Sequence, residues 1–308
     1  MAYLKSLPSI YSSSRSVGDV LEGTDTAIAL IEPSCSGDLA TLQSLLSHPD
    51  GIKLALGSPH RIYYEHRSMS GNENIRPVSA MPILNLVFAL EKAAHNGQVA
   101  VVSTFLSFAS QHGIDPSTLI TRPLVTRIIK KGDIEVFKAF VTADHQVINY
   151  HLLHGDYPLE RAVRSGQADI VAFILQHGAD LKLSSQRSYG YSGSLLSVAA
   201  RADDVRITEL LLKHGVTPAR SGGLHSAAER GAIDVMRVLI QRGVDVNEQL
   251  PEAFITPAHD TILASWTPMH FTASKDQVQA MELLESHGAR SDIEDRDGRI
   301  PKQLRKNV

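Results

Sequence analysis

The side chains in this sequence that could do chemistry are mainly histidines and carboxylates, and few of them have the spacing that a reactive site needs. The sequence has 14 histidines but a single cysteine, Cys35. His151 and His154 are three residues apart, yet no cysteine or carboxylate accompanies them at the spacing of a zinc site. We therefore expect no bound metal and no cofactor. Cys35 precedes a turn, so we expect it to pack as a small apolar residue.

Acid–base chemistry is the one reaction type for which candidates can be named. Glu91 and Glu160 each lie in a short predicted helix before a turn, where a carboxylate could face a ligand or pair with a neighbouring element. With two histidines they could catalyse the isomerisation or cyclisation of an organic molecule. No nucleophile elbow, His-Glu-x-x-His motif or phosphate-binding glycine loop accompanies them, which favours a protein that is not an enzyme. The candidates are Glu91, Glu160, His151 and His259.

The elements that must position these side chains repeat along the chain. Each copy has a pair of small residues, two polar residues, a turn residue and then an apolar helix; residues 227–247 give the clearest copy. Apolar residues three and four apart, such as Val235, Val238 and Leu239, predict a helix after the turn. The seven turn residues are Gly37, Gly97, Gly132, Gly166, Asp203, Gly231 and Asp276.

Recurring glycines follow the second helix of a copy and predict left-handed C-caps, because glycine adopts a positive φ without steric cost. A histidine precedes most of these glycines, where its ring can meet the negative end of the helix dipole. The predicted C-cap glycines are Gly113, Gly178, Gly215, Gly243 and Gly288.

The repeated unit resembles the ankyrin repeat, in which a β-turn and two antiparallel helices recur about every 33 residues and a Thr-Pro-Leu-His tetrad starts the first helix. Thr267-Pro268-Met269-His270 is the best match to that tetrad. The resemblance covers residues 27–304 and implies an all-α solenoid of about seven helix-turn-helix repeats with short β-turn or hairpin fingers. It also implies that His225 and His270, at the last tetrad position, form structural hydrogen bonds between neighbouring repeats.

The domain organisation follows from this resemblance. An N-terminal arm spans residues 1–26 and the repeat domain spans 27–308, with a C-terminal cap at 289–308. The turn residues are unevenly spaced, and the extra residues fall where ankyrin proteins carry fingers, on a face that often binds a partner. The enlarged fingers are expected at about 49–81, 183–194 and 248–266.

The fingers are rich in aromatic, arginine and histidine side chains. Such side chains form hot spots in protein interfaces because they give a large contact area at small entropic cost. The alternative is that aromatic residues attach long loops to the scaffold. The predicted binding residues are Arg61, Tyr63, Tyr64, His66, Tyr157, Arg187, Tyr189, Tyr191, Phe254 and Trp266, the only tryptophan.

Composition limits the possible partners. The formal net charge of −3 argues against a nucleic-acid surface. No stretch has the roughly 18 consecutive apolar residues of a membrane span, so we expect no membrane contact. One cysteine in 308 residues fits a reducing interior. We expect a cytoplasmic protein, with the nucleus as an open alternative.

Two functions fit these observations, and a purely structural array is a third alternative. The first is a protein–protein interaction module, an adaptor or an inhibitor, which binds an unknown protein along the concave surface made by fingers and first helices. The second is a small-molecule pocket that the enlarged fingers roof, with their aromatic residues as lining and the acid–base candidates at its wall. A finger enlarged by almost a whole repeat is the reason to keep the second.

Overall fold

The computed structural model of the chain describes residues 25–57, 85–152, 156–181, 183, 194–249 and 265–305. Within these ranges the regular structure is helical and no β-strand occurs, so the expected all-α class is confirmed. None of the described helices is both long and apolar enough to cross a membrane. The contacts divide the chain into two compact units, each considered by itself. The first contains residues 1–128 and 133–147, and the second contains 129–132 and 148–308.

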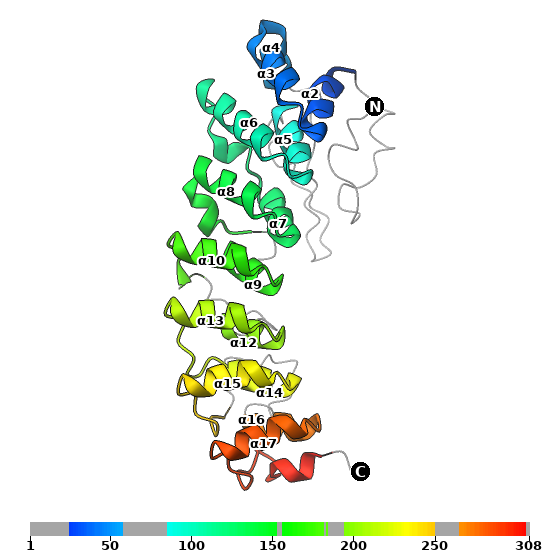
Figure 1. Ribbon diagram of the computed structural model, residues 1–308. Helices are drawn as coiled ribbons and strands as arrows, with labels where there is room; N and C mark the ends of the chain where they lie inside the picture. The colour runs from blue at the N-terminus through cyan, green and yellow to red at the C-terminus, as the bar shows by residue number, and fades with distance from the viewer. Residues whose placement is uncertain are drawn as a thin grey trace, which may run out of the picture. The chain divides into compact units, whose positions relative to one another are not determined.

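The first unit contains helix pairs joined by the predicted turns, and one additional helix. Helix α2 packs against α3, and α5 packs against α6. Helix α4 packs against both α3 and α5 and does not belong to a pair. The elements of this unit, shown in Figure 1, are α2 (Asp25–Ser36), α3 (Leu39–Ser47), α4 (Pro49–Leu56), α5 (Asn85–His95), α6 (Val99–Gln111), η2 (Pro116–Thr118), α7 (Arg122–Lys131, whose end belongs to the second unit), α8 (Ile134–Ala143) and η3 (His145–Asn149, whose end also belongs to the second unit).

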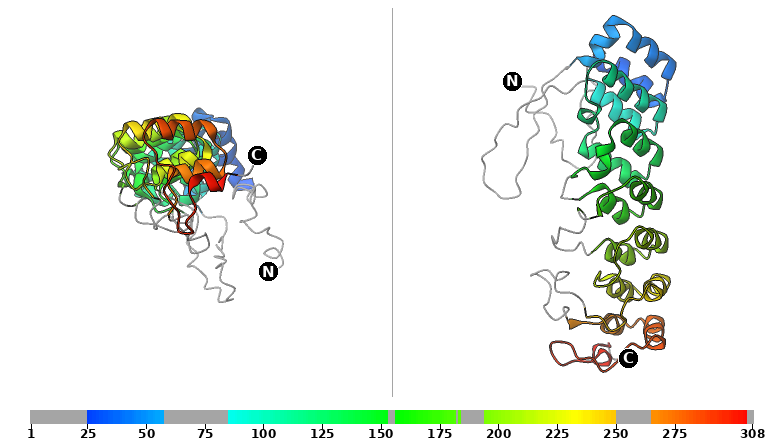
Figure 2. Two further views of the ribbon diagram at one scale, coloured as in Figure 1. Left: turned by 90° about the horizontal axis from the view of Figure 1, so that it is seen from below. Right: turned by 90° about the vertical axis from the view of Figure 1, so that its left-hand side faces the viewer.

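The second unit contains helix pairs that stack in chain order, as Figures 1 and 2 show. First helices pack on first helices, and second helices pack on second helices. The last element, η7, packs on α16 in the place of a further first helix. The pairs are α9 (Pro158–Arg164) with α10 (Ala168–Gln176), α12 (Leu195–Arg201) with α13 (Val205–Lys213), α14 (Gly223–Arg230) with α15 (Ile233–Gln241), and α16 (Pro268–Ser274) with α17 (Val278–Ser286), followed by η7 (Pro301–Leu304).

All seven predicted turn residues have a positive φ, from 54° at Asp276 to 79° at Gly37. Glycine takes this conformation without a Cβ clash, and aspartate is one of the few other residues that tolerate it. The five predicted C-cap glycines also have a positive φ. The periodic pattern therefore located both ends of the second helices.

The histidines before these glycines share one hydrogen bond. In each, Nδ1 lies 2.8–2.9 Å from the carbonyl oxygen four residues earlier. A carbonyl oxygen can only accept, so Nδ1 carries the proton and satisfies one of the free carbonyls at the helix end. These four residues are His112, His177, His214 and His287.

The segment predicted as an enlarged finger from residue 49 begins as helix α4. Pro49 occupies the first turn, where its missing N–H has no helical partner to lose, and the His48 ring accepts from Asp50 N. Gly51 lets α4 approach α3 closely, since a Cβ there would overlap the carbonyl oxygen of Leu45. Residues 58–84 and nearly all of the other two enlarged fingers lie outside the described ranges.

The N-cap residues of the second helices are aspartate, glutamine or, at Ala232, alanine, which makes no side-chain cap. Where the residue is aspartate, the short side chain caps its own helix: Asp38 accepts from Thr41 N at 3.0 Å, and Asp204 accepts from Ile207 N at 2.8 Å. Where it is glutamine, the longer side chain reaches the preceding repeat instead. Gln167 Nε2 lies 3.3 Å from the carbonyl oxygen of Lys130.

The glutamine N-caps favour glycine at some of the turns. A Cβ on Gly37, Gly132 or Gly231 would overlap the side-chain amide of the glutamine that N-caps the second helix of the next repeat. At Gly166 the next N-cap is Asp204, and a Cβ there would meet no atom within 4 Å. The turn residue and the following N-cap are therefore matched. The three glutamines are Gln98, Gln167 and Gln277.

Candidate functional site

The two tetrad histidines lie between neighbouring repeats of the second unit. His225 Nε2 lies 2.8 Å from the carbonyl oxygen of Glu248, and His270 Nε2 lies 3.3 Å from that of Arg299. Because carbonyl oxygens only accept, both imidazoles donate through Nε2. The Nδ1 atom of His270 accepts from the backbone N–H of Thr267, which fits this tautomer. Each bond joins the first helix of a pair to the segment that follows the second helix of that pair.

Burial keeps both imidazoles uncharged at neutral pH. It lowers the pKa of His225 to about 4, although hydrogen bonds to the backbone of Glu248 and Trp266 act in the opposite direction. Burial also lowers the pKa of His270, against the opposing effects of its bond to Arg299 and of the Asp295 charge. Both rings are neutral and their nitrogens form internal hydrogen bonds. Such histidines stabilise the fold and do not have the geometry of a proton-transfer site.

Glu91, a candidate acid, is buried in the first unit. Burial raises its pKa, and the charge of Arg127 and a hydrogen bond with Thr121 offset this only in part. Its Oε2 atom has no hydrogen-bond partner within the described residues. Glu91 is therefore a buried carboxyl that interacts with the start of α7, not a group on an open surface.

Three predicted site residues of the second unit lie together at the start of α9. Glu160 Oε2 accepts from the backbone N–H of Tyr157 at 3.0 Å, which caps the helix. The His151 ring meets the Tyr157 ring edge-on, with centroids 5.5 Å apart and an interplanar angle of 74°. His151 is exposed and Tyr157 is half-buried. The predicted acid Glu160, the predicted base His151 and the predicted binding residue Tyr157 thus lie together at the start of α9.

Two arginines beside this group converge on Asp156. Arg161 Nη2 lies 2.5 Å from Asp156 Oδ2, and Arg164 Nη2 lies 3.8 Å from Asp156 Oδ1. The Arg161 and Asp156 side chains are mostly buried, whereas that of Arg164 is 39% exposed. Arg161 Nε is buried without a hydrogen-bond partner in the described part of the chain. Two guanidinium groups therefore face one carboxylate.

Trp266, a predicted binding residue, immediately precedes Thr267, the N-cap of α16. Its indole Nε1–H donates to Asp295 Oδ2 at 3.2 Å. The ring stacks on His270 at a centroid distance of 6.1 Å and meets Phe271 edge-on at 5.1 Å. The side chain is nevertheless only half-buried. Trp266 is therefore fixed at its N–H and along its ring while part of it stays accessible.

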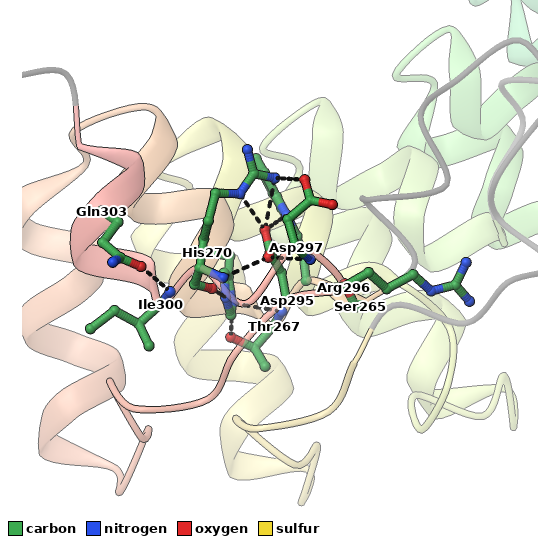
Figure 3. Close-up of polar contacts among 10 residues, drawn as sticks. Ser265, Thr267, His270, Asp295, Arg296, Asp297, Ile300 and Gln303 are labelled. Carbon is green, nitrogen blue, oxygen red and sulfur yellow. Dashed lines mark hydrogen bonds and ion pairs between the residues drawn. The ribbon is translucent and has the colours of Figure 1, made fainter.

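Asp295 is the centre of the polar cluster in Figure 3. Its Oδ1 accepts from the backbone N–H groups of Asp297 and Arg299, each at 2.9 Å. Its Oδ2 accepts from Arg299 Nε and Nη2, at 3.0 and 2.8 Å. Burial alone raises the pKa of Asp295, but the hydrogen bonds from Arg299, Asp297 and Trp266 outweigh it and hold the pKa below its usual value. The carboxylate is thus kept charged inside the fold.

Neither Asp295 nor the Arg161–Asp156 pair was among the residues that the sequence predicts. Asp295 stands in a turn-like Asp-x-Asp-Gly run, but no spacing rule pairs it with a tryptophan 29 residues earlier. The other predicted site residues lie outside the described ranges. These are Arg61, Tyr63, Tyr64, His66, Arg187, Tyr189, Tyr191, Phe254 and His259.

No group of three or more histidine, cysteine or acidic side chains that could hold a metal occurs within the described residues. An open groove of ≈ 680 Å³ lies between α3 and α4, and none of the predicted binding residues lines it. Its lining consists of Ala40, Thr41, Ser44, Leu45, His48, Asp50, Gly51 and Leu54.

Comparison with known proteins agrees with this geometry. A family model described as "Ankyrin repeats (many copies)" matches residues 224–285, and one described as "Ankyrin repeat" matches 154–185. The crystal structure of the ankyrin repeat domain of Bcl-3 has a TM-score of 0.54 and 18% identity, and the match covers 71% of this chain and 93% of that one. At this identity the likeness concerns the fold alone.

Curated relatives match over part of their length. The nuclear factor NF-kappa-B p105 subunit of Gallus gallus is 26% identical over 168 residues, 44% of this chain and 17% of the relative. Rabankyrin-5 of Homo sapiens is 24% identical over 220 residues, 68% of this chain and 17% of the relative. The B-cell lymphoma 3 protein homolog of Mus musculus is 31% identical over 109 residues, 34% of this chain and 23% of the relative. The chain thus spans less than a quarter of each relative.

The left-handed turns at the predicted positions, the stacked helix pairs and these matches agree with one another. The described residues therefore have the fold of an ankyrin-repeat domain, and ankyrin-repeat models match residues 154–185 and 224–285.

Proposed function

We propose that this chain is a protein-interaction module whose partner binds at the starts of the first helices in the second unit. One observation carries the proposal. Tyr157 and Trp266 occupy almost the same place in two repeats, since Tyr157 is the N-cap of α9 and Trp266 immediately precedes the N-cap of α16. Both are half-buried, and a neighbouring ring holds each of them.

Such side chains suit an interface because little conformational freedom remains to be lost on binding. An aromatic residue that is fixed before the partner arrives avoids part of the entropic penalty of association. Tyrosine and tryptophan are also enriched among the residues whose truncation weakens an interface most. The competing explanation is that each ring only attaches its own loop, and the bond from Trp266 to Asp295 would serve that purpose too.

The experiment compares these aromatic residues with a matched ring pair elsewhere. The full chain, purified from its own cells, is used to isolate a partner, and the affinity of that partner is measured for Tyr157→Ala and Trp266→Ala. The control is Phe173→Ala, because Phe173 on the second helix α10 also pairs with a histidine ring, His177, at 3.9 Å. We expect each of the first two changes to weaken binding by about 2 kcal/mol and the control to have little effect. Equal effects of all three would contradict the proposal.

The activity of the isolated partner, measured with and without this chain, distinguishes an adaptor from an inhibitor. The module acts as an inhibitor if the bound partner loses its own activity, and as an adaptor if that activity persists in the complex. The cytoplasmic location and the lack of a nucleic-acid partner stay predictions that fractionation and a binding assay with labelled DNA and RNA would check.

The small-molecule alternative also stays a prediction. It requires Tyr63, Tyr189 and Trp266 to surround one cavity, and the first two lie outside the described residues. Native mass spectrometry of the purified full chain tests it directly. A retained small-molecule mass that Trp266→Ala removes would favour the pocket over the protein interface.

A further inference from the structure

We propose that Arg161 and Arg164 form a subsite for an acidic segment of the protein partner, and that Asp156 occupies this subsite in the free protein. The inference rests on the proposed function and adds the chemistry of the partner. It begins from the two guanidinium groups of α9 that face a single carboxylate.

In the free protein, not every N–H donor of the Arg161 guanidinium has a hydrogen-bond partner within the described residues. Arginine has five N–H donors in a fixed plane, and its strongest carboxylate pairs use two of them at once. Asp156 approaches Nη2 of Arg161, while the adjacent Nε is buried without a partner within the described residues. A carboxylate that bound Nε and Nη2 together would satisfy this donor. The internal contact is therefore weaker than the one that the same arginine can make.

The contact of Asp156 with Arg164 is weak as well. The two atoms are 3.8 Å apart, which is an ion pair but too long for a hydrogen bond, and the Arg164 side chain is 39% exposed. The second acid at this place, Glu160, accepts from Tyr157 N, where its charge stabilises the positive end of the α9 dipole. Within the described residues, Arg164 is thus a partly accessible cation held by one distant carboxylate.

Asp156 is the member of this cluster that can move with the least disruption. It lies on the loop before α9, and the described contact that holds its backbone is the bond from Leu152 N to the Asp156 carbonyl oxygen, 2.8 Å long. The arginines stand on α9, which is anchored by the buried residues Leu159, Ala162 and Val163. A partner carboxylate can therefore displace Asp156 without unpacking the helix.

The neighbouring rings favour an acidic peptide over a free anion. Tyr157 is half-buried and His151 is exposed, and their rings are in contact at the start of the helix that carries both arginines. A peptide that places a carboxylate on the guanidinium groups can lay an adjacent side chain against these rings, whereas a free inorganic anion has nothing to place there.

The test uses a fluorescein-labelled hexaglutamate peptide and the full chain, with binding measured by fluorescence anisotropy at low salt. Arg164→Gln is the first variant because Arg164 is partly exposed and Arg161 keeps its contact with Asp156. We expect it to weaken binding about fivefold. Asp156→Asn removes the internal competitor and should tighten binding several-fold. Thermal melting of both variants verifies that they fold.

The matched control is Arg237→Gln. Arg237 stands on the second helix α15 in an exposed ion pair with Asp234, so this change removes the same charge from the same unit. Equal weakening by Arg237→Gln and Arg164→Gln would mean that the peptide follows net charge, and the inference would be wrong. It would also be wrong if Asp156→Asn failed to tighten binding, or if inorganic phosphate bound as well as the peptide.

The partner itself separates this inference from the proposed function. If Tyr157→Ala weakens binding of the isolated partner while Arg164→Gln does not, the proposed interface is supported and the acidic subsite is wrong. If neither change affects the partner, the proposed function fails as well.

Discussion

Trp266 and Asp295 are joined by a hydrogen bond between an indole N–H and a carboxylate whose side chain is fully buried. The bond links the start of α16 to the loop before η7, which are 29 residues apart in the sequence. The same carboxylate accepts from Arg299, so one acidic side chain orders two segments of the last repeat. Because the chain has one tryptophan, its tryptophan emission comes from Trp266 and reports on the surroundings of that ring.

Replacing Asp295 with asparagine should loosen this cluster. The neutral amide loses the charge-assisted bonds from Arg299, and one of its two polar atoms is a donor that faces other donors. We expect a loss of about 2 kcal/mol in the free energy of unfolding and a red-shifted emission from Trp266. Urea unfolding followed by fluorescence measures both. Asp292→Asn, which breaks an exposed pair with Arg290, is the control and should leave the emission unchanged.

His225 should make the protein less stable in mild acid. Its pKa is about 4 in the fold because of burial, against 6.5 as the ordinary value, so the unfolded chain takes up a proton that the folded chain refuses. The contribution of neutral His225 to the free energy of unfolding is fully present above pH 6.5. It is lost as the pH falls toward 4, by about 3 kcal/mol in all. Unfolding curves at pH 7 and pH 5 should differ less for His225→Gln than for the wild type. An equal pH dependence in the two proteins would show that another group is responsible.

Glu91→Gln should stabilise the protein at neutral pH. Burial raises the pKa of Glu91, so the folded state favours the protonated form. The contribution of Glu91 to stability is therefore fully present below its ordinary pKa of 4.5 and is lost as the pH rises through the higher folded pKa. The glutamine carries no charge, and we expect a gain on the order of 1 kcal/mol at pH 7 that vanishes near pH 4. Thermal melting at both pH values tests this, with Glu135→Gln on the surface as the control.

Alanine at two turn glycines should have unequal effects. Both Gly132 and Gly166 have a positive φ, so each change costs about 1 kcal/mol from backbone strain. Alanine at Gly132 also displaces the Gln167 amide from the carbonyl oxygen of Lys130, which adds roughly 1 kcal/mol. Urea unfolding of the two variants gives the difference.

A second change checks that this difference comes from the glutamine. With Gln167→Ala already in place, Gly132→Ala and Gly166→Ala should cost the same. If Gly132→Ala remains the more damaging in that background, the side chain of Gln167 is not the cause.

Local signals in the sequence were sufficient for the repeat architecture. The turn at Asp203 illustrates this, because the register of the neighbouring copies located it although it is not glycine, and its φ is 55°. Turn and cap positions depend on one residue and its immediate neighbours, which a sequence displays directly. Helix α4 shows the limit: Pro49 and Asp50 are ordinary helix-start residues, but the spacing of the turns predicts a finger for this segment.

The candidate site was harder to predict because its contacts join distant residues. Residue type and position predict three of the site residues, Tyr157, Glu160 and His151, and the structure brings them together at α9. The sequence does not predict the residues around them, since nothing local marks Asp156 as the residue that contacts Arg161. Glu91 was expected to face a ligand or a neighbouring repeat, and its burial depends on how α5 packs, which residue type alone does not reveal.

The glutamine N-caps restrict how this gene segment could be rearranged. In the described repeats each glutamine N-cap follows a glycine turn: Gln98 follows Gly37, Gln167 follows Gly132 and Gln277 follows Gly231. Copying the α9–α10 repeat to a position after α12–α13 would bring the amide of Gln167 against the side chain of Asp203. Duplication and recombination within such an array therefore depend on the order of the repeats, because the turn residue of one repeat must fit the N-cap residue of the next.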